Sequence, residues 1–182
     1  MKILMLASEA VPFAKTGGLA DVAGSLPPVL QRLGHEVILF LPKYRCIQQG
    51  GFPIEPTGFT FSIPIVDKTI GCSIEKTRIP GTDVPVYLVA CDNYFNRDGL
   101  YQDNGRDYPD NLERFVLYCR AVLHALEFIP FRPDIIHAND WQTALVPTYL
   151  RTQKIKDPYF ESTRILFTVH NLAYQGQFPR DQ

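Results

Sequence analysis

Four clusters of polar and glycine residues in this chain could bind a ligand, because each follows a short apolar stretch. The first cluster begins at Ser8 and Glu9 and continues to Lys15–Gly18, and the others are residues 92–101, 137–141 and 170–176. If the apolar stretches are parallel strands of one sheet, all four clusters lie along the edge where ligands bind in open α/β sheets. This grouping favours a single site for a polar ligand.

The segment Lys15–Gly18 has the composition of an anion site. Glycine lets the backbone come close to a phosphate or a sugar, and a helix starting near Leu19 would direct its N–H groups toward the same anion. The segment matches neither GxGxxG nor GxxxxGK[ST], so the fingerprints of dinucleotide-binding folds and ATPases are absent. An ordinary strand-to-helix turn with a surface lysine explains the segment equally well.

Asp140 and Trp141 suit a carbohydrate, since a carboxylate accepts hydrogen bonds from hydroxyls and an aromatic ring packs on the apolar face of a sugar. Asp140 is also a candidate N-cap for the following helix, and Trp141 a candidate core residue. His170 follows a strand end, where ligand groups gather, although a single histidine is more often structural. Tyr94 and Tyr101 fit either a core or a platform for a sugar ring.

Several other functions are disfavoured by the composition. The four histidines lack metal-site spacing, no GxSxG elbow is present, and 18 basic against 19 acidic residues give no general attraction to nucleic acid or anionic membranes. No apolar run approaches the roughly 20 residues of a membrane span. The cysteines form no CxxC pair and are expected as free thiols in a reducing compartment: Cys46, Cys72, Cys91 and Cys119.

Strands and helices that alternate along the chain must position these clusters. The predicted core strands are residues 3–7, 37–41, 84–90, 134–137 and 164–169, and the predicted helices are about 19–33, 110–126 and 141–152. Residues 59–66 and 72–79 alternate in polarity and predict an antiparallel hairpin. The pattern predicts an α/β fold with a doubly wound, mostly parallel Rossmann-like sheet.

Three local features of the helices are also predicted. Pro27 and Pro28 should kink or restart the first helix, and Gly34 sits where a C-cap glycine belongs. Asp110 and Glu113 have the spacing of a capping box at the start of the second helix.

Three segments resemble the signature sequences of glycogen and starch synthases: Lys2–Val22, Asp134–Ala144 and Phe167–Gly176. Their order and spacing also match, and the resemblance runs over essentially the whole chain. It implies the GT-B architecture, in which two Rossmann-like domains face each other across a cleft. Residues 1–182 would be the amino-terminal, acceptor-side domain, and a carboxy-terminal nucleotide-binding domain would lie beyond Gln182. We therefore expect this chain alone to be inactive.

The resemblance further implies the reaction. Glucose would move from ADP-glucose to the non-reducing end of an α-1,4-glucan with retention of configuration, without a metal or other cofactor, in a bacterial cytoplasm or a plastid stroma. Lys15 and Gly18 would bind the donor, and His170 would be the catalytic residue beside the transferred glucose. Phe95 stands where some relatives have an acceptor-contacting tyrosine. The residues implied on the acceptor side are Glu9, Asp21, Phe95, Asp140 and Asn171.

Two alternatives remain open from the sequence. The chain could be a glucan-binding module without catalytic activity, or part of a GT-B transferase with another sugar-nucleotide donor, such as a sucrose or trehalose-phosphate type. The opening Lys15–Asp21 argues against the second alternative.

Overall fold

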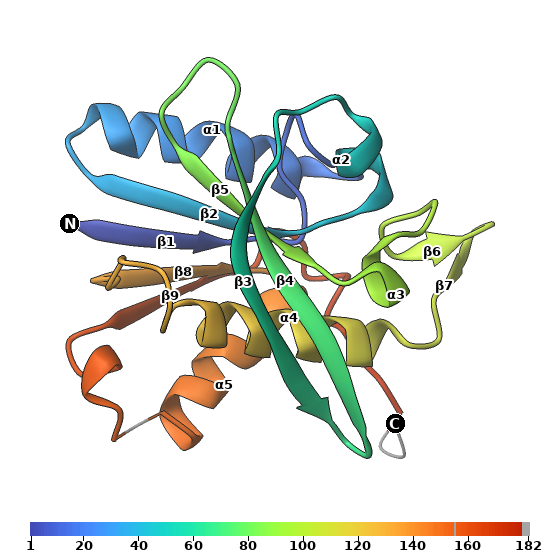
Figure 1. The fold of residues 1–182 in the computed structure, drawn as a ribbon. Helices are drawn as coiled ribbons and strands as arrows, with labels where there is room; N and C mark the ends of the chain where they lie inside the picture. The colour runs from blue at the N-terminus through green and yellow to red at the C-terminus, as the bar shows by residue number, and fades with distance from the viewer. Residues whose placement is uncertain (155, 180–182) are drawn as a thin grey trace.

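The computed structural model describes residues 1–154 and 156–179, and its centre is a mostly parallel sheet (Figure 1). Within the described residues the sheet has seven strands in the order β3-β4-β5-β2-β1-β8-β9. The last five in this order run parallel, namely β5 (Pro85–Ala90), β2 (Glu36–Pro42), β1 (Lys2–Leu6), β8 (Ile135–Asn139) and β9 (Arg164–Thr168). Strand order therefore reverses between β1 and β8, which is where open α/β sheets bind ligands.

The strands at the centre of the sheet are buried on both faces, as their continuous apolar sequences predict. From Ile3 to Leu6 and from Val37 to Pro42 every residue is buried. In the register of the sheet, Met5 of β1 lies between Leu39 of β2 and His137 of β8. The polar residues that follow these strands consequently share one edge of the sheet.

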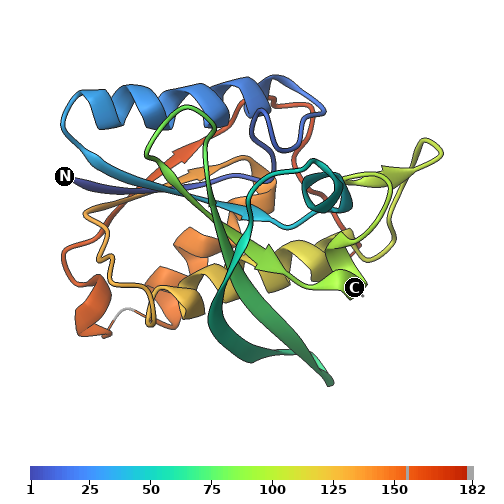
Figure 2. The same cartoon turned by 45° about the horizontal axis from the view of Figure 1, so that its top comes forward.

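Helices cover both faces of the sheet, so the predicted doubly wound arrangement is confirmed (Figures 1 and 2). On one face lies α1 (Gly18–Arg32), and on the other lie α4 (Asn111–Ala125) and α5 (Leu145–Thr152). The helix α1 continues through Pro27 and Pro28 without the predicted restart. Gly34 follows this helix with a φ of 85°, as expected of a C-cap glycine.

The predicted hairpin is confirmed and is longer than expected. It consists of β3 (Glu55–Ile65) and β4 (Lys68–Arg78), and β4 pairs antiparallel with β5. The shorter elements are α2 (Arg45–Gln49), α3 (Asp92–Phe95), β6 (Gln102–Asp103), β7 (Arg106–Asp107), and the 3-10 turns η1 (Trp141–Thr143) and η2 (Pro158–Phe160). Thus α3 lies within the polar cluster of residues 92–101, and β6 and β7 follow it.

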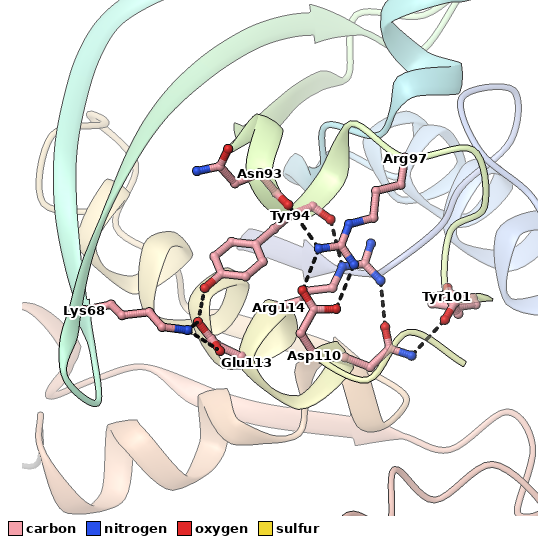
Figure 3. Close-up of polar contacts among 9 residues, drawn as sticks. Lys68, Asn93, Tyr94, Arg97, Tyr101, Asp110, Glu113 and Arg114 are labelled. Atoms are coloured by element: carbon pink, nitrogen blue, oxygen red, sulfur yellow. Dashed lines mark hydrogen bonds and ion pairs between the residues drawn. The ribbon is translucent and has the colours of Figure 1, made fainter. Parts of the chain in front are cut away.

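The predicted capping box at α4 is wrong, because both of its side chains have other partners (Figure 3). The Asp110 carboxylate accepts a hydrogen bond from Arg97 Nη1 at 2.7 Å. The Glu113 carboxylate accepts hydrogen bonds from the Tyr94 hydroxyl and, at 3.2 Å, from Lys68 Nζ. Asp110 therefore ties the start of α4 to the segment after α3, and Glu113 ties α4 to α3 and to the hairpin.

At the outer edge of the sheet, β9 is more open than the other parallel strands. None of its five residues is classed as buried, and Leu166 and Phe167 are 50% and 43% exposed. Within the described part of the chain, no helix is long and apolar enough to cross a membrane.

Candidate functional site

A pocket of about 890 Å³ lies beyond the carboxyl ends of β1, β8 and β9. Its lining includes Glu9 and Gly18 from the first loop, Asp140 after β8, and His170 and Asn171 after β9. The predicted convergence of the loops at this edge is therefore observed. A second, more open hollow beside the β3–β4 hairpin is lined by none of the predicted site residues.

Glu9 anchors the loop that precedes α1. It is only 4% exposed, and its Oε2 accepts hydrogen bonds from the backbone N–H groups of Thr16 and Gly17, the latter at 3.1 Å. Its Oε1 accepts a hydrogen bond from Thr16 Oγ1 at 2.9 Å. Glu9 thus contributes to the site mainly by fixing the loop of residues 15–18.

The start of α1 opens onto the pocket. A Cβ atom added to Gly17 or Gly18 would meet no atom within 4 Å, so the space beside both glycines is free. The N–H groups of the first helical turn have no helical acceptor and carry the positive end of the helix dipole. This arrangement suits a negatively charged ligand that approaches along Gly17 and Gly18.

Lys15 and Asp21 lie at the rim and not in the lining of the pocket. Lys15 Nζ donates to the Asp21 carboxylate at 2.7 and 2.8 Å, and the two side chains are 51% and 57% exposed. An ion pair this exposed is weak, since water and salt screen both charges. Little free energy is needed to release Lys15 toward an anion.

Asp140 connects the ends of β8 and β9. Its Oδ1 accepts a hydrogen bond from the backbone N–H of His170 at 2.7 Å, and its own N–H donates to Thr168 O at 2.9 Å. Its φ of 57° is one that residues with a side chain rarely adopt. Asp140 occupies the N-cap position of η1, as predicted, but its side chain makes no capping hydrogen bond there.

The imidazole of His170 is oriented by a buried amide. Asn139 Nδ2 donates to Leu6 O at 2.9 Å and to His137 O at 3.1 Å. Asn139 Oδ1 is therefore the atom that accepts from His170 Nε2 at 2.9 Å. A neutral His170 must then carry its proton on Nε2, which leaves Nδ1 as an acceptor.

His137 lies in β8 beside the site and makes structural contacts. It is 8% exposed, and its Nε2 lies 2.8 Å from Thr168 Oγ1. Burial, with a further contribution from the nearby His170, lowers the pKa of His137 below its usual range. His137 is consequently a neutral link between β8 and β9.

Asn171 and Phe95, both expected on the acceptor side, lie in opposite environments, one exposed and one buried. Asn171 is exposed, and its Oδ1 accepts a hydrogen bond from Ala173 N at 2.9 Å. Phe95 is fully buried and packs edge-on against Tyr44, with ring centroids 5.7 Å apart. Because no part of its side chain reaches the pocket, Phe95 is a core residue in this structure.

Tyr101 and Trp141 also line the pocket. The ring of Trp141 packs edge-on against Phe115 with centroids 5.0 Å apart, and Gly176 lies so close that an added Cβ would fall 2.7 Å from the indole. The hydroxyl of Tyr101 reaches Glu9, and no sequence signal links two residues so far apart in the chain. In residues 1–154 and 156–179, no three His, Cys, Asp or Glu side chains are grouped as metal ligands.

Comparison with known proteins identifies the family to which this chain belongs. The family model of the starch synthase catalytic domain matches residues 2–182, and the chain belongs to this family of glycosyltransferases. Among curated proteins, the glycogen synthase of Syntrophotalea carbinolica is 49% identical over 184 residues, which cover 100% of this chain and 37% of that protein. The chain therefore spans little more than a third of the length of this relative.

The similarity of this chain to solved structures agrees with its membership of this family. The catalytic domain of starch synthase IV from Arabidopsis thaliana, bound to ADP and acarbose, is 35% identical with a TM-score of 0.82, over 96% of this chain and 34% of that one. A sucrose-phosphate synthase from Thermosynechococcus elongatus has a TM-score of 0.50 at 16% identity, over 100% of this chain and 36% of that one. The second likeness shows the fold alone. The expected GT-B class is thereby confirmed.

Proposed function

We propose that the protein containing this chain is a glycogen or starch synthase, which transfers glucose from ADP-glucose to the non-reducing end of an α-1,4-glucan with retention of configuration. One observation carries the proposal. Thr16–Gly18, Asp140 and His170 line one pocket at the switch point of the sheet, and Lys15 lies next to Thr16 in the same loop. The related starch synthase IV, which binds ADP and acarbose, supports the same ligands here.

In this proposal the first loop and α1 receive the donor phosphates. Transfer of the glucosyl group passes through an oxocarbenium-like centre while negative charge grows on the departing phosphate. The first-turn N–H groups of α1 stabilise this charge, and Lys15 leaves Asp21 to add a full positive charge. Gly18 keeps the approach to these N–H groups open.

His170 is proposed to orient the transferred glucose. Asn139 fixes the ring, so Nδ1 is presented as an acceptor for a sugar hydroxyl, without reorganisation at the moment of reaction. Asp140 and Asn171 are proposed to face the glucan acceptor, with Glu9 and Asp21 supporting the loop beside them. We propose no enzymic nucleophile and no metal, and the leaving phosphate would serve as the base.

The domain formed by residues 1–182 would be the acceptor side of a two-domain cleft and would not transfer glucose by itself. This part of the proposal is supported by the comparison with the curated relative, because the chain matches only 37% of that protein's length. Closure over the pocket would exclude water, which otherwise hydrolyses the donor. A reducing compartment, a bacterial cytoplasm or a plastid stroma, suits the four free cysteines.

The direct test is transfer by the intact protein. Maltooligosaccharide would be incubated with ADP-, UDP- or GDP-glucose, and the product would be digested with an α-1,4-specific glucosidase. We expect transfer mainly from ADP-glucose and a fully digestible product. Preference for another donor would support a different GT-B transferase. Binding of maltooligosaccharide without any transfer would instead support a glucan-binding module.

A further inference from the structure

A chain of hydrogen bonds runs from α4 to the loop of residues 15–18. The hydroxyl of Tyr101 lies 2.7 Å from Ser8 Oγ and donates to Glu9 Oε1 at 3.1 Å. The same Glu9 carboxylate binds the N–H groups of Thr16 and Gly17. Tyr101 is therefore one partner away from the loop to which the proposed function assigns the donor phosphates.

The backbone of Tyr101 is held from the opposite side (Figure 3). Asn111, at the start of α4, donates through Nδ2 to Tyr101 O at 2.8 Å. Its Oδ1 accepts in turn from Arg114 Nη1 at 2.7 Å, and Arg114 Nε donates to Tyr94 O at 2.8 Å. The Asn111 amide is thus fixed at both of its polar atoms.

Arg114 is an unusual anchor because it is fully buried. Burial lowers its pKa, and its cation lies over the rings of Phe95 and Tyr108, 5.4 and 5.0 Å from their centroids. A buried guanidinium has a high desolvation cost, and Arg114 donates its two hydrogen bonds to the Tyr94 carbonyl and the Asn111 amide. Such an arrangement fixes the geometry of α4 and of the segment around Tyr101.

The chemistry of Tyr101 agrees with a holding role. Burial raises the pKa of Tyr101 well above its usual range, so the phenol keeps its proton and remains a donor to the Glu9 carboxylate. Its ring packs beside Phe115 with centroids 5.9 Å apart. A rigid donor of this kind limits the positions that Glu9, and through it the loop, can adopt.

We infer that Tyr101 is a positioning residue for the donor-binding loop of residues 15–18, acting through Glu9, and that Asn111 and Arg114 hold Tyr101 in place for this role. The inference rests on the proposed function for the identity of the ligand. The ligand binds only those molecules whose loop is in the correct position. The fraction of such molecules therefore limits the apparent affinity for the ligand.

The first experiment uses the intact protein without ligand. Tyr101→Phe removes only the hydroxyl, so we expect amide hydrogen exchange at Thr16 and Gly17 to become about tenfold faster, as loss of one hydrogen bond to a charged group implies. The control is Tyr159→Phe, which removes a hydroxyl that donates to Phe131 O at 2.6 Å, away from the pocket. Unchanged exchange at Thr16 and Gly17 in Tyr101→Phe would overturn the inference.

The second experiment measures affinity for ADP by calorimetry. The Kd of Tyr101→Phe should rise about tenfold, whereas Tyr159→Phe should stay within twofold of the wild type. Weaker ADP binding with unchanged amide exchange would mean that Tyr101 contacts the ligand directly, against a positioning role. A wild-type protein that binds no ADP would contradict the proposed function, and the exchange result would still decide the positioning of the loop.

Asn111→Asp tests the link to α4. The carboxylate still accepts from Arg114 but no longer donates to Tyr101 O, so exchange at Thr16 and Gly17 should again accelerate. If Asn111 acts through Tyr101, the double variant should differ little from Tyr101→Phe. If the effects of the two substitutions on amide exchange instead multiply in the double variant, Asn111 and Arg114 do not act through Tyr101, and that part of the inference is wrong.

Discussion

The backbone N–H of His170 donates a hydrogen bond to the carboxylate of Asp140 at 2.7 Å, so a residue just beyond β9 takes its position from the residue after β8. The ring of His170 is fixed at the same time by Asn139, the last residue of β8. Both contacts depend on the parallel pairing of these two strands. The proposed catalytic group is therefore held by the sheet and not by its own loop.

Asp140 should be important for stability as well as activity. Asp140→Ala removes the acceptor of the His170 N–H while keeping the unfavourable positive φ, and we expect a loss of about 2 kcal/mol in the free energy of unfolding. Asp140→Asn keeps an acceptor and tolerates this φ, so its loss should be below about 1 kcal/mol. Urea denaturation of the three proteins measures the difference, and equal losses would contradict the assigned hydrogen bond.

Lys15 should be needed for the donor but not for the fold. In the intact protein, Lys15→Ala should lower kcat/KM for ADP-glucose by about 100-fold or more and change the free energy of unfolding by less than about 0.5 kcal/mol. The matched control is Lys2→Ala, since Lys2 and Glu36 form an exposed pair at the opposite end of β1, with Nζ and Oε2 3.5 Å apart. Equal kinetics in the two variants would rule out the donor role.

Two glycines of α1 should respond oppositely to alanine. At Gly18 an added Cβ meets nothing within 4 Å, so Gly18→Ala should leave stability unchanged and weaken ADP binding by occupying space in the pocket. At Gly24 the added Cβ would lie 2.3 Å from Val11 O, and Gly24→Ala should destabilise the protein by about 2 kcal/mol or more. Thermal unfolding together with calorimetry separates the two effects.

The lowered pKa of His137 predicts that the stability of the protein depends on pH. Its folded-state pKa lies below the unfolded value of about 6.5, so the unfolded chain binds the proton more readily. The free energy of unfolding should therefore fall as the pH is lowered through about 6.5, and should level off below the folded-state pKa. His137→Gln should remove this part of the slope between about pH 7 and pH 5, whereas His35→Gln, just before β2, should keep it.

The sequence predicted the sheet and its ligand-binding edge because both follow from local patterns. Apolar runs such as Val37–Leu41 identify buried parallel strands, and the order of the clusters follows from the order of the strands. The positions of Glu9, Gly18 and His170 at one pocket were within reach of this reasoning. Whether each of them performs its assigned role stays a prediction.

Side-chain partners across the fold were not predictable in the same way. Asp110 and Glu113 have the spacing of a capping box, yet Arg97 and Tyr94 compete for their carboxylates through tertiary contacts. Asp140 has the sequence of an N-cap, but its carboxylate accepts from the N–H of His170, which lies just beyond the neighbouring strand β9. Local spacing cannot reveal a partner that the tertiary fold brings from elsewhere in the chain.

The open edge of β9 has a practical consequence for handling residues 1–182 by themselves. A strand that shows its backbone and the side chains of Leu166 and Phe167 to water is a template for a strand from another molecule. Residues 1–182 produced by themselves should therefore self-associate as their concentration rises, edge against edge. Sedimentation over a dilution series would reveal this self-association. Ligand titrations with residues 1–182 should therefore use the lowest protein concentrations of that series.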